Sequence, residues 1–221
     1  MHYSNDFTTA GLNHLATALH DNKTLTFLRL ASNSLEDVDA QHLSNVLRQN
    51  KVLTILKLQD NRIGDAGAKY LANALENNTV HNDSKNSIET DGIQYIADAL
   101  QNNTVLAELY LGFNLVADDG VQHLTEALQN NTTLTVLDLA NADIRVKGAQ
   151  YLADLLISDN TKLSRLYLKN NSVEDVGSQH LGNALRKNQT LNTFLIGSNP
   201  FGHYEARRLA DALAFHTVFS T

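Results

Sequence analysis

The sequence predicts an α/β fold, a curved solenoid with a parallel sheet on its concave face and helices on its convex face. Matching segments recur along the chain, and six of them begin with a leucine: Leu25, Leu53, Leu106, Leu134, Leu163 and Leu191. Three of the five spacings are 28 residues and one is 29, while the gap from Leu53 to Leu106 is three residues short of two units. Each unit shows apolar residues first at alternate positions and then at helical spacing, which indicates stacked strand–helix units.

The first half of each unit is predicted to be a short strand. In the unit that begins at Leu53, Leu56 and Leu58 alternate with Ile55 and Lys57. Successive side chains of a strand point to opposite faces, so the leucines face the core and the residues between them face solvent.

The second half of each unit is predicted to be a helix, because Leu71, Ala74 and Leu75 form one apolar stripe. The Asp of "GDAG", "ADDG" and "EDVG" stands where a helix N-cap belongs. A recurring Asn follows each strand, where a buried amide satisfies backbone groups that become free as the chain turns. These residues are Asn5, Asn33, Asn61, Asn86, Asn114, Asn171 and Asn199, with Ala142 in the slot of one repeat, where we expect a local shift of register.

The full pattern is L-x-x-L-x-L-x-x-N-x-[ILV]-x-D-x-G-x-x-x-L-x-x-A-L, and residues 53–75 show it whole. It resembles the leucine-rich repeat over essentially the whole chain. The long unit is similar to the ribonuclease-inhibitor-like class, also found in the sensor ends of NOD-like receptors and in Ran GTPase-activating proteins. Strands about 4.8 Å apart and helices about 8–10 Å apart would bend such a stack into a horseshoe.

The repeats predict one leucine-rich-repeat domain over residues 1–221, since only Pro200 and no proline- or serine-rich stretch interrupts it. An N-terminal half-repeat occupies 1–24, about seven repeats follow from residue 25, and a polar capping repeat occupies 191–221, with Glu205 in the glycine slot. The chain starts inside a unit, so we expect a longer parent protein or a partner over that end.

One repeat, near 78–90, is degenerate. Its helix half is intact, but Asn78, His81 and Asp83 occupy the three strand-leucine slots. We expect a short, irregular or displaced strand and a local break in the sheet, which a solenoid tolerates because each repeat contacts only its neighbours. The segment is interpreted as a harmless deletion, as a notch or hinge for a partner loop, or as disorder with swapping between chains.

Composition excludes several classes of function. Net charge −7 argues against nucleic acid or an anionic membrane as partner, and the absence of cysteine excludes a disulfide scaffold or a cysteine-ligated zinc site. Neither a membrane span, a signal peptide nor a nucleotide or hydrolase motif occurs. Histidines and tyrosines recur at one helix edge, too far apart to share a metal, and the acidic pairs are interpreted as caps. We therefore expect no enzyme activity, metal, cofactor or small-molecule substrate.

The remaining candidate site is the solvent face of the strands, where the repeat does not dictate the residue. Exposed aromatic and charged side chains there are typical of protein interfaces. The candidate partner-binding residues are Phe27, Arg29, Ile55, Lys57, Glu108, Tyr110, Phe113, Asp138, Arg165, Tyr167 and Lys169.

We expect a non-enzymatic module that binds a partner protein through this face. Resemblance to ribonuclease inhibitor implies an inhibitor that covers an enzyme surface, and the composition is similar to leucine-rich-repeat effectors of intracellular bacterial pathogens. The expected location is the cytoplasm, or the host cytoplasm for such an effector. The alternatives are a ligand-sensing or scaffold region of a larger receptor-like protein and, by fold analogy, a GTPase-activating protein.

Overall fold

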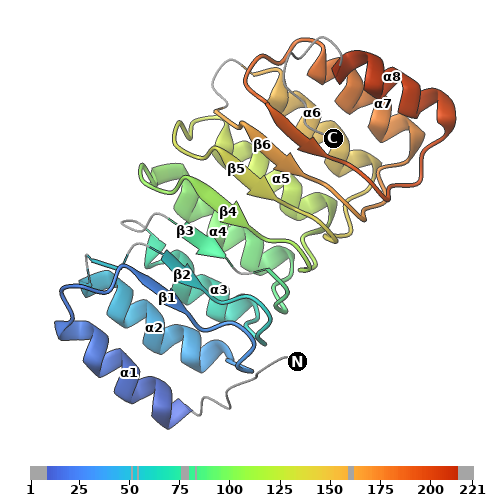
Figure 1. The fold of residues 1–221 in the computed structure, drawn as a ribbon. Helices are drawn as coiled ribbons and strands as arrows, with labels where there is room; N and C mark the ends of the chain where they lie inside the picture. Colours follow the sequence, from blue (N-terminus) through green and yellow to red (C-terminus); the bar gives the residue numbers. More distant parts are fainter. Residues whose placement is uncertain are drawn as a thin grey trace.

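The computed structural model describes residues 9–50, 52–53, 55–75, 80–82, 84–158 and 162–213, and shows strands alternating with helices (Figure 1). The strands are β1 (Phe27–Arg29), β2 (Ile55–Lys57), β3 (Val80–Asn82), β4 (Glu108–Tyr110), β5 (Val136–Asp138), β6 (Arg165–Tyr167) and β7 (Thr193–Leu195). The helices are α1 (Thr9–Asp21), α2 (Asp37–Gln49), α3 (Asp65–Ala72), α4 (Thr90–Asn102), α5 (Ala117–Leu128), α6 (Val146–Leu156), α7 (Glu174–Leu185) and α8 (His203–Leu213). Phe7 and Asn5 of the predicted N-terminal half-repeat lie outside the described residues.

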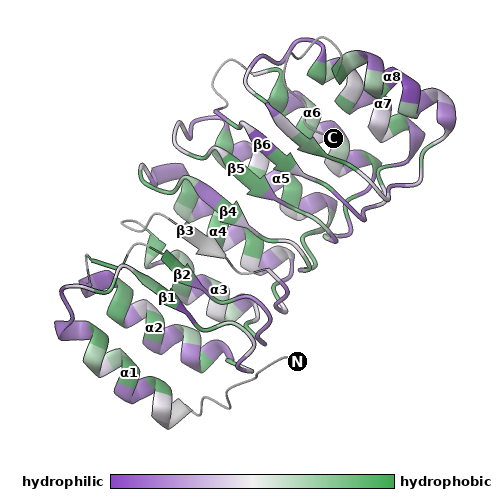
Figure 2. Cartoon of the chain, in the orientation of Figure 1, coloured by the Kyte–Doolittle hydropathy of each residue, from purple (hydrophilic) through white to green (hydrophobic). Residues whose placement is uncertain are grey.

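The described strands form one parallel sheet in chain order, and each helix packs against the next one in a second layer (Figure 1). This is the curved solenoid that the repeat predicts. Each helix carries hydrophobic and hydrophilic residues on different sides (Figure 2), as a layer with one buried face requires. The described helices are all too short or too polar for a transmembrane span.

The degenerate repeat does not break the sheet, so that expectation was wrong. β3 pairs in register with both neighbours, and His81 stands at the position of Leu56 and Leu109. Parallel strands pair through their backbones, so the ladder continues without the leucines. The three missing residues fall between β2 and β3, since Ile55 pairs with Val80 25 positions on while Val80 pairs with Glu108 28 positions on, and α3 spans 8 residues while α4 spans 13. Asn78 and Asp83 lie outside the described residues.

The buried hydrophobic residues that the structure describes fall into two clusters. One cluster of buried residues runs from Leu12 to Ala74, and a larger one runs from Ala68 to Ala212. The two clusters meet at α3, whose Leu71 belongs to the first and Ala72 to the second. Leu56 of β2 therefore belongs to the first described cluster, and the inward residues of β4 to β7 belong to the second.

The asparagine ladder links consecutive repeats, as predicted. Asn61 Oδ1 accepts hydrogen bonds from the backbone N–H of Asn33 and Leu35, and its Nδ2 donates to the carbonyls of Leu30 and Leu58. Asn171 makes the same four contacts in its own repeat. Ala142 is fully buried in its ladder slot, and the strands there keep their register. The expected register shift at Ala142 was therefore wrong, and the alanine simply removes one amide from the ladder.

Acidic residues cap helices in two ways. Glu36 and Asp39 form a capping box at the start of their own helix α2, whereas Asp37, Asp65, Asp118 and Asp175 bind the start of the helix in the following repeat. Asp37 Oδ1 accepts from the N–H of Gly64 and Gly67, at 2.7 and 2.9 Å. Asp118 Oδ1 does the same for Arg145 and Gly148, at 2.8 and 2.9 Å. The prediction that each Asp caps its own helix was wrong, because only the stacking of repeats brings the next helix start within reach. Each such carboxylate ties two repeats together.

Where that Asp is missing, the next helix starts differently. Thr90 and Val146 occupy the Asp37 position in their repeats, and the helices that follow, α5 and α7, begin at residues with positive φ. These residues are Ala117, with φ 53°, and Glu174, with φ 58°. The starts of α3, α4 and α6, each bound by an Asp of the preceding helix, are extended instead.

Candidate interaction surface on the sheet

The candidate residues form two groups on the exposed face of the sheet, one on each side of β3. On β1 and β2, Phe27 pairs with Ile55 and Arg29 pairs with Lys57. We call these four residues the N-terminal patch. The C-terminal patch, on β4 to β6 and the turns after them, contains Glu108, Tyr110, Phe113, Val136, Asp138, Arg165, Tyr167 and Lys169.

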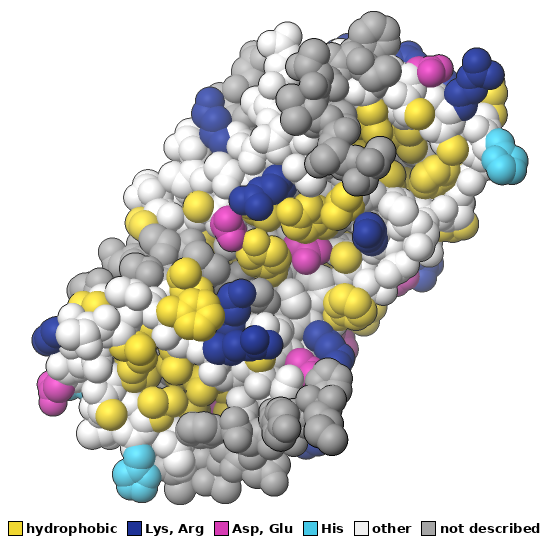
Figure 3. All heavy atoms as spheres, viewed as in Figure 1, with side chains coloured by type: hydrophobic (Ala, Val, Ile, Leu, Met, Phe, Trp, Pro, Cys, Tyr) yellow, Lys and Arg dark blue, Asp and Glu magenta, His cyan; other side chains and the backbone are white. Residues whose placement is uncertain are grey.

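The N-terminal patch combines an exposed ring with positive charge. Phe27 is 46% exposed, and the Lys57 Nζ lies 5.8 Å from the centre of its ring. Neither Arg29 nor Lys57 forms an ion pair with any described residue, whereas nearby Lys85 is held by Asp60 at 2.6 Å. Figure 3 shows Lys and Arg side chains gathered beside hydrophobic ones on the sheet side of the molecule. This patch suits a partner surface that offers apolar groups together with carboxylates.

In the C-terminal patch an ion pair spans two strand spacings. Arg165 Nη2 lies 3.1 Å from Glu108 Oε1, and the two residues flank Val136 in register. Val136 has no exposed surface, although its position in the repeat predicts a solvent-facing side chain. The long side chains of the ion pair pass over this smaller residue and explain its burial.

Tyr110 extends this contact, because its hydroxyl donates to Glu108 Oε2 at 2.9 Å. Both carboxylate oxygens of Glu108 are therefore engaged. Burial, the hydrogen bond to Glu108 and the charge of Glu108 together raise the pKa of Tyr110 to about 12, against an opposing effect of Arg165. The hydroxyl stays protonated at neutral pH and serves as a fixed donor.

Asp138 stands between Tyr110 and Tyr167, its partners in register on the two neighbouring strands. Its Oδ1 accepts the N–H of Ala140 at 2.9 Å, and no described cation pairs with it. Burial raises the pKa of this carboxyl, and the hydrogen bond from Ala140 only partly offsets the rise. Asp138 is thus a partly desolvated carboxylate without a counter-ion in the described chain.

Two other candidates lie in the turns at the ends of strands. Phe113, after β4, is 54% exposed and has φ 60°, and its N–H donates to the carbonyl of Ala140. Lys169, after β6, is exposed. Sequence reasoning missed Gly112, where an added Cβ would lie 3.0 Å from the Ala140 oxygen and 3.3 Å from Asp138 Oδ1. The glycine in the turn after β4 was the feature of the sequence that indicated this close approach.

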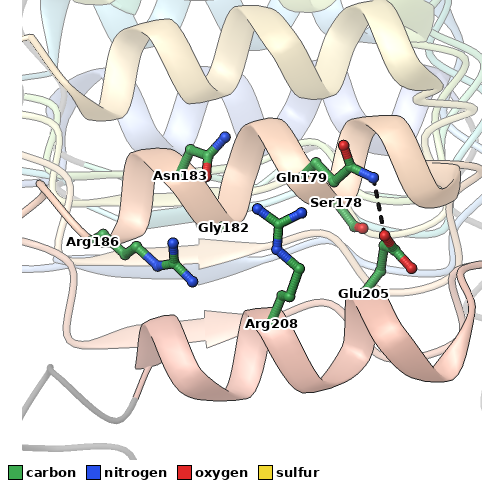
Figure 4. Close-up of a pocket in the computed structure, with 7 residues that line it drawn as sticks. All are labelled: Ser178, Gln179, Gly182, Asn183, Arg186, Glu205 and Arg208. Carbon is green, nitrogen blue, oxygen red and sulfur yellow. Dashed lines mark hydrogen bonds between the residues drawn. The ribbon is translucent and has the colours of Figure 1, made fainter.

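The described cavities lie among the helices and not at the candidate residues. A site between α7 and α8 is lined by Ser178, Gln179, Gly182, Asn183, Arg186, Glu205 and Arg208 (Figure 4). Its volume of about 10 Å³ is enough for about one water molecule, and Gln179 donates to Glu205 there at 2.9 Å. An open groove of about 270 Å³ lies between α3 and α4. No group of three or more metal-ligating side chains occurs among the described residues.

Comparisons with known proteins agree with this architecture. Residues 21–44, 49–72 and 130–153 match the family model described as Leucine Rich repeat. These matches cover about a third of the chain, and with the recurring strand, asparagine turn and helix they support a leucine-rich-repeat fold.

Among solved structures, the chain is similar to "Leiomodin-1 Actin-Binding Site 2 (ABS2)", with 19% identity and a TM-score of 0.47 over 55% of this chain and 70% of that chain. It is also similar to the tropomodulin C-terminal domain of Caenorhabditis elegans, with 13% identity and a TM-score of 0.41 over 92% of this chain and 91% of that chain. The comparison with curated proteins gave no match.

Proposed function

We propose that this chain is a non-enzymatic module that binds a partner protein against the exposed face of its sheet. One observation carries the proposal: aromatic and charged side chains stand in register on neighbouring strands, while Arg29, Lys57 and Asp138 find no counter-ion among the described residues. Tyrosine and arginine are the usual anchors of protein interfaces, and unpaired charges beside them select a complementary surface.

The shape of the molecule supports a macromolecular partner over a small substrate. The candidate residues extend along the row of strands from β1 to β6, and the described cavities lie on the helix side. The titratable groups of the sheet face line none of the described cavities, whereas general acid–base catalysis requires such groups around a bound substrate.

Two concrete forms of the proposal are an inhibitor that covers an enzyme surface and a bacterial effector acting in the host cytoplasm. The long sheet face supports the first form. The acidic, cysteine-free composition supports the second, and it accords with a cytoplasmic partner.

Affinity capture followed by mass spectrometry tests the proposal with two matched double variants. Phe27→Ala/Tyr167→Ala removes one ring from each patch, and Tyr95→Ala/Tyr204→Ala removes two exposed rings from the helices. Circular dichroism and thermal melting establish that both variants fold. We expect a specific protein to be retained by the wild type and by the helix variant, and lost with the sheet variant. Retention by the sheet variant together with loss by the helix variant would place the binding surface on the helices and refute the proposal.

A further inference from the structure

We infer that the partner inserts one cationic side chain, an arginine or a lysine, between Tyr110 and Tyr167 to pair with the carboxylate of Asp138. This inference rests on the proposed function and specifies the chemistry of a single contact on the same face. It predicts a basic residue at the centre of the partner surface that contacts the C-terminal patch.

Three neighbouring strands form the proposed binding site for the cationic side chain. Tyr110, Asp138 and Tyr167 are in register on β4, β5 and β6, so their side chains leave the same face of the sheet. Neighbouring strands are about 4.8 Å apart, which puts the two tyrosines about 10 Å apart with the carboxylate midway. A cation within about 6 Å of a ring centre is attracted to its face. One cation above Asp138 therefore lies within reach of both rings.

No cation of the described residues fills this position. Arg165, the nearest arginine on the neighbouring strand, is paired with Glu108 at 3.1 Å. Lys169 extends toward Gly197, since its Cε lies 4.0 Å from the position of a Cβ at that glycine, on the side away from Asp138. The carboxylate accepts a hydrogen bond from Ala140 through Oδ1 and has no other described partner.

Gly112 lets the backbone of its turn pass close beside Asp138 without a side chain over the carboxylate. Gly112 presents backbone where a Cβ would come within 3.3 Å of Asp138 Oδ1. On the other side, the Glu108–Arg165 pair covers Val136 and holds Tyr110 through its hydroxyl. Tyr110 is thus fixed before a partner arrives, which reduces the entropy lost on binding.

A carboxylate in this setting favours a cation over a neutral group. Burial without a counter-ion is unfavourable for Asp138, and an incoming cation removes that cost while it contacts the two rings. A neutral side chain of equal shape contacts the rings but leaves the carboxylate unpaired.

The first test uses the peptide Ac-Gly-Arg-Gly-NH₂ and its citrulline analogue, which has nearly the same shape but no charge. Nuclear magnetic resonance follows the ring signals of the tyrosines during each titration. We expect the arginine peptide to shift the signals of Tyr110 and Tyr167, with Tyr95 and Tyr204 on the helices as internal controls. Equal shifts with citrulline, or equal shifts at the helix tyrosines, would overturn the inference.

Asp138→Asn and Asp154→Asn provide matched charge changes, because Asp154 is exposed on α6. An asparagine at 138 keeps an acceptor for the N–H of Ala140, so the fold remains. We expect the arginine peptide to bind the Asp138 variant about tenfold more weakly and the Asp154 variant as it binds the wild type. Equal binding to both variants would reject Asp138 as the cation site.

The captured partner supplies a test that separates this inference from the proposed function. A partner lost with Phe27→Ala/Tyr167→Ala but bound equally by wild type and Asp138→Asn leaves the sheet face as the interface and refutes the cation contact. A partner bound at least about tenfold more weakly by Asp138→Asn, with no change for Asp154→Asn, supports it.

Discussion

Arg165 and Glu108 join across an intervening strand, with Arg165 Nη2 3.1 Å from Glu108 Oε1. The pair covers Val136, and Glu108 also holds the hydroxyl of Tyr110. Glu108 therefore positions side chains on β4 and β6 and helps to cover Val136 on β5. Its replacement should change both the pKa of Tyr110 and the stability of the fold, which can be measured separately.

Glu108→Gln should lower the pKa of Tyr110 from about 12 toward the ordinary value near 10, because it removes the charge while burial remains. The ring ¹³C shift of Tyr110 between pH 9 and 12.5 measures this change. In the wild type the raised pKa favours folding below about pH 10, and the benefit is lost as pH rises from about 10 to 12. A Tyr110 pKa that stays near 12 in the variant would show that burial alone sets it. Since the ion pair is partly exposed, we expect a stability loss of at most about 1 kcal/mol.

Asp138→Asn should make the fold slightly more stable at neutral pH, although it removes the proposed cation contact. Burial raises the pKa of Asp138 in the folded state. The folded protein then binds more protons than the unfolded chain between the two pKa values, so stability falls as pH rises through that window. The advantage of the variant should therefore vanish below about pH 4, where both side chains are neutral. Urea unfolding of variant and wild type at pH 7 and at pH 3.5 measures the difference in their free energies of unfolding. A variant less stable than wild type at pH 7 would contradict the argument.

Asn61→Ala should destabilise the protein by about 3 kcal/mol, since it leaves several buried backbone groups without partners. Asn61 makes four such contacts with Asn33, Leu35, Leu30 and Leu58. Asn33→Ala is the matched control, because Oδ1 of Asn33 has no hydrogen-bond partner in the structure as described. We expect its cost to be less than half as large. Denaturant unfolding compares the two, and equal costs would mean that the ladder contacts of Asn61 contribute little.

Gly67→Ala should lower the free energy of unfolding by about 2 kcal/mol, even though alanine favours helices. A Cβ at Gly67 would lie 2.6 Å from both Asp37 Oδ1 and Ile63 Cγ2. Gly197→Ala is the control, because its nearest neighbour would be Lys169 Cε at 4.0 Å. Thermal melting should show a lower midpoint for the first variant only. An unchanged melting midpoint for Gly67→Ala would mean that α2 and α3 move apart to admit the methyl group at no measurable cost.

Much of the fold follows from the repeat in the sequence. The alternation around Leu56, the helical stripe at Leu71 and the asparagine at 61 each require one local conformation, and the structure has all three. The positions of the candidate residues on the strands could also be predicted, because a period of two leaves no freedom in which face a side chain takes. Val136 shows the limit, since its burial depends on two long side chains from other strands.

Sequence alone specified the repeat unit, the order of its strand, turn and helix, and the row of side chains that faces solvent. These are local properties, set by spacing along the chain. The tertiary structure decided which repeat each aspartate caps, that β3 keeps its place in the sheet, and that Asp138 stands between two tyrosines while Arg165 reaches Glu108. Each of these depends on distances of a few ångströms between residues about 28 or 57 positions apart, which only the stacking of repeats brings together.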